Sequence, residues 1–141
     1  SSAASDVYKR QVRNQLIYLQ DLVPTVYDLV GIKKPNHLEF ISQINALKSS
    51  KASSHRKAIY SAYLQEAQRM VTDGHYKLFF IPASKDAYLF DLEKDPQETN
   101  NLFGSPQYKR IVKRLCAEYQ KLSKESGDTF NLAAIYPELF Q

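Results

Sequence analysis

The Asp73-Gly74 pair constrains the fold of this 141-residue chain more than any other feature. It separates two runs rich in strand-forming residues, Gln68–Thr72 and Tyr76–Ile81. A type I′ turn needs positive φ at both central residues, and Asp-Gly is among the pairs that adopt it most readily. The pair therefore predicts an antiparallel β-hairpin.

Two further strands are expected, one on each side of this hairpin. Residues 58–64 are rich in strand formers, and residues 88–92 form a short aromatic and aliphatic run. Pro82 ends the second hairpin strand, and residues 84–86 supply a turn. Strands joined by such short connections pair with their neighbours, so the sequence predicts a four-stranded antiparallel meander.

A single long helix is predicted after the sheet. Ser105 and Pro106 are typical of the N-cap and first positions of a helix, and Ser126-Gly127 is typical of its end. One apolar stripe on one helix fits one face of a four-stranded sheet, which predicts an α+β fold for residues 58–141. The stripe, at i, i+3, i+4 spacing, consists of Tyr108, Ile111, Val112, Leu115, Tyr119 and Leu122.

Residues 12–57 are expected to form a separate region. Asp21 offers an N-cap oxygen, Pro24 lies in the first turn, and Gly31 supplies a left-handed C-terminal residue, which predicts a short helix between them. A helix of this length is unstable alone, so it must pack on something. Residues 33–47 are expected to be a loop, and the basic, serine-rich residues 48–57 a solvated linker.

Residues 1–11 are polar and small and have no periodicity, so we expect a disordered tail without function. Their composition is also that of foreign sequence joined to a reading frame.

The composition excludes several classes of protein. Hydrophobic residues make up 43% and charged residues 24%, as in soluble globular proteins, and no apolar run approaches the roughly 20 residues that span a bilayer. A net charge of +4 is well short of a dedicated nucleic-acid binder. The single cysteine, Cys116, excludes an internal disulfide framework and a cysteine-rich zinc site.

Three segments carry a family resemblance, and they occur in the family's order. Residues 89–102, LFDLEKDPQETNNL, resemble the YDLxxDPxExxNL segment near the C-terminal end of formylglycine-dependent sulfatases, with Phe90 where tyrosine is commoner. Residues 21–31 resemble the helix that ends the large domain of these arylsulfatase-like enzymes, and residues 69–77 resemble their RxvRtdryKy hairpin.

The resemblance implies that this chain is the C-terminal fragment of a sulfatase. Residues 12–57 would be the end of its alkaline-phosphatase-like α/β catalytic domain with a connecting loop, and residues 58–141 its C-terminal subdomain. The parent enzyme would hydrolyse sulfate esters, sulfated carbohydrates among them, with calcium and formylglycine as cofactors. Its partners would be a sulfated small molecule or saccharide and the absent N-terminal catalytic domain, with no nucleic acid and no membrane; a periplasmic or secreted location would fit the family.

The chain itself is expected to contain no catalytic residue and to bind no metal. Formylglycine is made from the first residue of a C/S-x-P-x-R motif, and neither Cys116 nor Ser105 starts one. Asp91, Asp95 and Glu98 are close in sequence, but a turn at Asp95-Pro96 explains them, and a hard cation needs more converging oxygens.

The candidate substrate-binding residues are Gln68, Arg69 and Tyr63. An arginine can bind a carboxylate or a second sulfate of a sugar with two parallel hydrogen bonds, and a tyrosine can stack on a sugar ring. The alternative for Arg69 is a structural salt bridge, to Asp91 or Glu66, and the alternative for Tyr63 is a place in the core.

Two other functions stay open at this point. One is a basic module that binds polyanions, which is supported by the net charge and by the basic residues 48–57. The other is a structural or interaction domain, for which the apolar face of the helix at residues 23–30 speaks.

Overall fold

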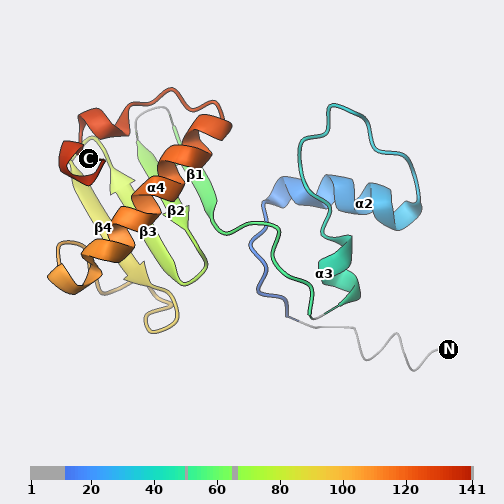
Figure 1. Ribbon diagram of the computed structural model, residues 1–141, viewed down its shortest axis with the longest axis horizontal. Helices are drawn as coiled ribbons and strands as arrows, with labels where there is room; N and C mark the ends of the chain where they lie inside the picture. The colour runs from blue at the N-terminus through green and yellow to red at the C-terminus, as the bar shows by residue number, and fades with distance from the viewer. Residues whose placement is uncertain (1–11, 50, 65–66, 141) are drawn as a thin grey trace. The chain divides into compact units, whose positions relative to one another are not determined.

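A computed structural model describes residues 12–49, 51–64 and 67–140 of the chain (Figure 1). The chain divides into two compact units, Ser1–Arg56 and Lys57–Gln141. The division lies one residue before the boundary expected from the sequence. The expected tail at residues 1–11 lies outside the described residues.

The described part of the first unit contains two short helices, α2 (Leu22–Val30) and α3 (Ile44–Lys48), with a 3₁₀ turn at Leu19–Asp21 before α2. Gly31 ends α2 with a φ of 70°, as its place in the sequence predicts. Two expectations are wrong: α3 interrupts the loop predicted at residues 33–47, and the Asp21 side chain does not cap α2. It turns instead toward the segment after α2.

The second unit is built on a four-stranded antiparallel sheet with the strand order β1-β2-β3-β4, which confirms the predicted meander. The strands are Ile59–Tyr63 (β1), Gln68–Thr72 (β2), Tyr76–Ile81 (β3) and Asp86–Asp91 (β4).

The β2–β3 turn differs from the predicted type I′ turn. Gly74 has a φ of 89°, but Asp73 is not among the residues with positive φ. The Asp73 carboxylate instead accepts hydrogen bonds from the backbone N–H groups of His75 and Tyr76, at 3.0 and 2.7 Å. An Asx-type turn therefore joins the strands, with residues 73–75 between them.

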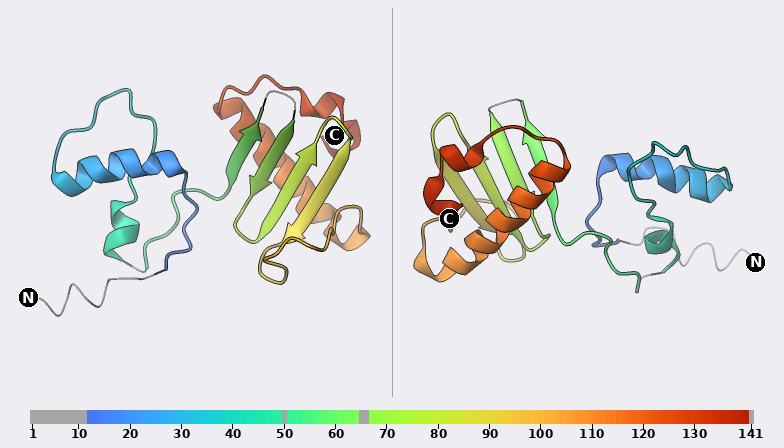
Figure 2. Two further views of the ribbon diagram at one scale, coloured as in Figure 1. Left: turned by 180° about the vertical axis from the view of Figure 1, so that it is seen from behind. Right: turned by 45° about the horizontal axis from the view of Figure 1, so that its top comes forward.

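The predicted long helix is α4 (Lys109–Glu125), which follows a 3₁₀ turn at Pro106–Tyr108 and crosses one face of the sheet (Figures 1 and 2). Its stripe meets the sheet in one hydrophobic core. The 3₁₀ turns Leu132–Ala134 and Pro137–Leu139, which no sequence pattern predicted, bring Leu132 and Tyr136 to this core. The buried sheet and helix residues of the core include Tyr60, Val71, Leu78, Phe80, Leu89, Val112, Leu115, Cys116 and Tyr119.

The acidic segment after β4 is held by hydrogen bonds to two of its own side chains. Asp95 accepts hydrogen bonds from the Asn100 N–H at 2.8 Å and from the Thr99 hydroxyl at 3.1 Å. Asn101 Oδ1 accepts from the Leu89 N–H at 3.0 Å, which ties the loop to β4. The turn thus accounts for the Asp95 carboxylate as part of the fold.

Candidate functional site

Arg69, the central candidate from the sequence, lies in β2 on the face that α4 covers. Its side chain is 2% exposed and binds Asp128, with Nε at 2.7 Å from Oδ2 and Nη2 at 3.2 Å from Oδ1. The structural salt bridge therefore forms, but its partner is Asp128 and not Asp91; Glu66 lies outside the described residues.

The same guanidinium also holds the end of the β1–β2 hairpin. Nη1 donates to the carbonyl oxygens of Leu64 and Gln68, at 3.1 and 2.9 Å. Leu64 has a φ of 51°, in the left-handed region that a leucine rarely adopts. The arginine thus fixes the two backbone positions on either side of the hairpin connection.

Aromatic side chains enclose the Arg69–Asp128 pair. The Tyr60 hydroxyl donates to Asp128, and the Arg69 guanidinium lies 4.6 Å from the centre of the Phe130 ring. Burial acts to raise the pKa of the Asp128 carboxyl, but the hydrogen bonds from Arg69 and Tyr60 outweigh it and hold this pKa below its ordinary value. Burial raises the pKa of Tyr119 to about 12, so this phenol stays neutral at neutral pH. The lowered pKa of Asp128 keeps its carboxylate ionised there.

Tyr63 and Gln68 lie together, directly opposite each other across the β1–β2 pairing. Successive strand residues point to opposite faces, so Gln68 and Tyr63 share the face away from α4, while Arg69 points toward the helix. Tyr63 is 62% exposed, so its expected place in the core is wrong. The structure therefore brings two of the three candidates together and separates them from the third.

Asp128 is the residue of this cluster that the sequence reasoning missed. It follows the C-terminal glycine of α4 and lies 59 residues from its partner Arg69. No local pattern marks such a pairing. A lone acid just after a helix end, in a segment with an otherwise apolar composition, was the only signal available.

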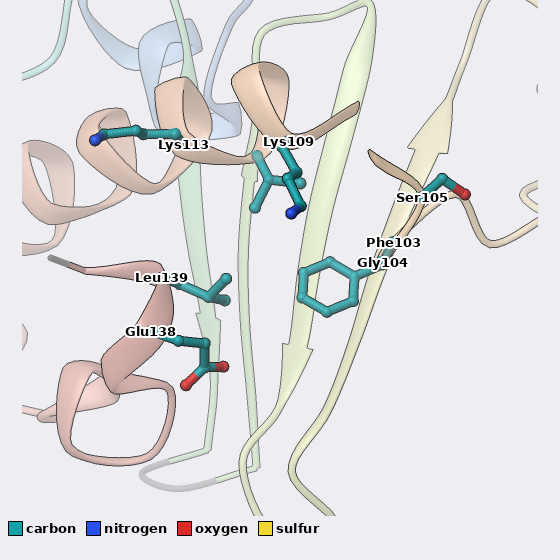
Figure 3. A pocket seen from close by; sticks show the side chains of 8 residues that line it. Phe103, Gly104, Ser105, Lys109, Lys113, Glu138 and Leu139 are labelled. Carbon is teal, nitrogen blue, oxygen red and sulfur yellow. The ribbon is translucent and has the colours of Figure 1, made fainter. Parts of the chain in front are cut away.

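A pocket of about 550 Å³ lies beside the start of α4 (Figure 3). Lys109 and Lys113 project from α4, and Glu138 and Leu139 come from the C-terminal 3₁₀ turn. The lining offers one carboxylate, one hydroxyl and two ammonium groups, and it includes no histidine or cysteine among the described residues. It can hold a small molecule but lacks a nucleophile with an adjacent base. The remaining lining residues are Phe103, Gly104, Ser105 and Val112.

His75, just before β3, lies close to the Asp91 carboxylate at the end of β4. Its Nε2 lies 3.2 Å from Asp91 Oδ1, and its ring stacks on Tyr76 with centroids 4.1 Å apart. Burial acts to raise the pKa of Asp91, but the Lys94 N–H and ammonium outweigh it and lower this pKa overall. Across residues 12–49, 51–64 and 67–140, no three histidine, cysteine or acidic side chains converge as metal ligands. In the same residues, no helix is both long and apolar enough to cross a bilayer.

Comparison with known proteins places these features in a family. The sequence model described as "N-sulphoglucosamine sulphohydrolase, C-terminal" matches residues 3–125. An uncharacterized protein of Haemophilus influenzae is 33% identical over 119 residues, which cover 82% of this chain and 60% of that protein.

A sulfatase sequence and a solved sulfatase structure are similar over a comparable stretch. The Delta 4,5-hexuronate-2-O-sulfatase of Bacteroides thetaiotaomicron is 31% identical over 114 residues, covering 74% of this chain and 24% of the enzyme. The solved structure of a 2-O GAG sulfatase matches 77% of this chain and 25% of its own, with 30% identity and a TM-score of 0.63. The chain thus spans about a quarter of each sulfatase.

Proposed function

Because this chain belongs to the family of N-sulphoglucosamine sulphohydrolase C-terminal domains, we propose that it is the C-terminal part of an enzyme that hydrolyses sulfate esters of carbohydrates. The observation that carries the proposal is the family match over residues 3–125, which takes in described parts of both units and all of α4. The similar enzymes are named for sulfated sugars, a hexuronate 2-O-sulfate in one case and GAG in another.

The chemical step is assigned to the part of the parent enzyme that precedes this chain. Formylglycine would supply the nucleophile and calcium would neutralise the sulfate, but the described residues do not fit either group. Cys116 is 2% exposed, burial raises its pKa to about 12, and Glu118 stands where the C/S-x-P-x-R motif needs proline. A buried thiol with such a pKa is inert as a nucleophile. No step of the reaction is therefore attributed to this chain.

The contribution of this chain is substrate positioning at the β1–β2 hairpin. Tyr63 presents an exposed ring that can stack on a sugar, and Gln68 opposite it offers an amide that can bond a hydroxyl. Arg69 is a positioning residue in this proposal, because its guanidinium holds the carbonyls on both sides of the hairpin connection. Its own bond to Asp128 replaces the substrate contact first considered for it.

Two assays test the function. The 141-residue chain with calcium should not turn over an aryl sulfate, whereas a longer protein that joins it to a preceding C/S-x-P-x-R domain should. In that longer protein, Tyr63→Ala should raise KM for a sulfated disaccharide about tenfold and leave turnover of a small aryl sulfate unchanged. Turnover by the short chain would overthrow the assignment, and equal effects on both substrates would remove the role of Tyr63.

The interaction-domain alternative has one observation in its favour. The α2 helix carries Val23, Val26 and Leu29 exposed, the last at 59%. Such an apolar face is expected on a helix that packs against another domain, and it fits the proposed parent enzyme equally well. The alternative of a polyanion-binding module depends on the basic residues 48–57. It is weakened because one of their cations, Arg56, already binds Asp21.

A further inference from the structure

The outward side of α4, opposite its apolar stripe, is strongly cationic. The helix contains six lysine or arginine residues and two glutamates, so its net charge of +4 equals the formal net charge of the whole chain. All six cations are exposed, and from the geometry of an α-helix they fill an arc of about 140°, with both glutamates just beyond one edge of it. We call this arc the cationic face; its cations are Lys109, Arg110, Lys113, Arg114, Lys121 and Lys124.

The placement of these charges weakens the helix itself. Lys109 and Lys113 lie four residues apart, and like charges at this spacing destabilise a helix. Arg110 and Arg114 repeat the pattern one position later. The first turn contains no acid, so Lys109 and Arg110 also oppose the positive end of the helix dipole. A surface that served solubility alone would mix the two signs, so this pattern indicates an anionic partner.

Most of these cations have no acidic partner in the described part of the chain. Arg114 Nη2 lies 2.6 Å from Asp73 Oδ2. The other five cations of the face form no ion pair with any described residue, whereas Arg56 of the first unit binds Asp21. The face extends over about 20 Å along the helix axis, from residue 109 to residue 124. It can therefore meet an extended polyanion at several points without breaking an existing pair.

The pocket beside the start of α4 adjoins this face (Figure 3). Lys109 and Lys113 line it, together with the Phe103 ring and the Glu138 carboxylate. The ammonium groups suit a sulfate, the ring suits the apolar side of a sugar, and the carboxylate can accept hydrogen bonds from sugar hydroxyls. A ligand without hydroxyl groups, such as free sulfate, would instead be repelled by Glu138. The pocket thus favours a sulfated sugar over a simple anion.

Nucleic acids and membranes fit this face less well. The exposed side chains of α4 include no aromatic ring, on which the bases of a single strand would stack. The large hydrophobic side chains that are exposed in the described residues all precede residue 65, so none lies on α4 to enter a bilayer. The charge and the pocket therefore point to a sulfated polysaccharide.

We propose that the cationic face and its pocket bind a sulfated polysaccharide, an inference that names the partner and rests on the function proposed above. The sulfate groups lie against the cations of α4, and one sulfated sugar unit occupies the pocket beside Phe103. Such contacts are mainly electrostatic, so they weaken steeply as salt is added. Because several sulfates bind at once, a long polymer gains affinity that a single sugar ester lacks.

A negative charge at the centre of the face tests the proposal. Ala117 is exposed between Lys113 and Lys121, four residues from each. Binding of heparin by the 141-residue chain would be measured by titration calorimetry in about 0.1 M salt. Ala117→Glu should weaken binding at least about fivefold, whereas Ala117→Gln, of the same size without the charge, should change it about twofold or less. Opposite charges four residues apart support a helix, so unfolding of α4 would not explain the loss.

A second pair of variants separates the cationic face from the basic segment at residues 48–57. The double change Arg110→Gln and Lys121→Gln should weaken heparin binding at least about tenfold and make it less sensitive to salt. The control, Lys48→Gln with Lys51→Gln, removes the same charge from exposed positions and should cost about twofold or less. Equal losses would show that net charge alone drives binding, and a larger loss in the control would assign it to the basic segment; either result overturns the proposal.

Other ligands distinguish this partner from its rivals. Binding of desulfated heparin through α4, or tighter binding of duplex DNA or phosphatidylserine vesicles there than of heparin, would also overturn it. If heparin binds through α4 and the longer protein hydrolyses no sulfate ester, the binding face stands and the proposed function falls. If the longer protein is active and no substitution in α4 weakens heparin binding, the face falls alone.

Discussion

The carboxylate of Asp21 binds both terminal nitrogens of Arg56, at 2.6 and 2.8 Å, across 35 residues of the first unit. Asp21 is 0% exposed and also accepts hydrogen bonds from the backbone N–H groups of Tyr18 and Ile41, at 2.9 and 3.1 Å. The Arg56 guanidinium lies 4.8 Å from the centre of the Tyr18 ring. One buried carboxylate thus joins the segment before α2, the segment after it and the end of the unit.

Removal of this carboxylate should destabilise the first unit. Asp21→Ala leaves Arg56 without its buried partner, and such a change costs about 3–5 kcal/mol. Urea unfolding followed by circular dichroism should show a loss of the helical signal of α2 at lower urea. Asp28→Asn is the matched control, because Asp28 pairs with Lys34 at 3.3 Å on the surface. This control should leave the unfolding midpoint nearly unchanged; equal losses in both variants would contradict the role of Asp21.

Arg69→Lys should destabilise the second unit while keeping a positive charge at the site. A lysine cannot make the two parallel bonds to Asp128 and also reach the carbonyls of Leu64 and Gln68. We expect a loss of about 2–4 kcal/mol in the free energy of unfolding. Tyr63→Ala, at an exposed ring on the opposite face of the sheet, should change it by about 0.5 kcal/mol or less. A stable Arg69→Lys variant would contradict the argument.

The stability of the second unit should fall in acid because of Asp128. Its pKa in the folded state lies below its ordinary value of 3.8, so the unfolded state takes up the proton first as the pH falls. The stabilisation is therefore complete at neutral pH, begins to decline at about pH 4–5, and is lost as the pH falls through the lowered pKa.

Asp128→Asn supplies the comparison for this pH dependence. The variant should be less stable at neutral pH and should lose less stability than the unmodified chain between about pH 5 and about pH 2. Urea unfolding at fixed pH values measures both quantities. Parallel pH profiles of the two proteins would show that another carboxylate is responsible.

The exposed face of α2 should drive self-association of the isolated chain. Leu29→Lys places a charge at the centre of this face and should lower the sedimentation coefficient at high protein concentration toward that of a monomer. Asn36→Lys, at an exposed position after the helix, adds the same charge elsewhere and should have no effect. A monomer at every concentration in the unmodified chain would refute the prediction.

Local patterns were sufficient to predict the sheet and α4. The Asp73-Gly74 pair and the spacing from Tyr108 to Leu122 act over a few residues, so the hairpin and the helix could be read from the sequence. The details of the turn could not, because the Asp73 carboxylate takes the N–H of His75, which in a type I′ turn would bond the backbone carbonyl of Thr72.

The side-chain partners were beyond sequence reasoning. Asp21 looked like a helix cap, and only the folded first unit shows that its carboxylate meets Arg56 instead. The sequence likewise suggested an acidic partner for Arg69, but the suggested residues were wrong or undescribed, because the partner Asp128 lies far away in sequence, beyond α4. Such pairs depend on tertiary packing, which overrides local preference.

The strand pairings of the second unit join only consecutive strands, whereas Asp128 and Tyr136, which bond to the sheet, lie beyond α4 in the sequence. The Tyr136 hydroxyl donates to the carbonyls of Ile81 and Asp86, at 3.2 and 2.8 Å, across the mouth of the β3–β4 turn. During synthesis the meander can therefore form early, since its contacts are short in range. The Arg69–Asp128 pair and the bonds of Tyr136 can form only after the polypeptide beyond α4 has been synthesised.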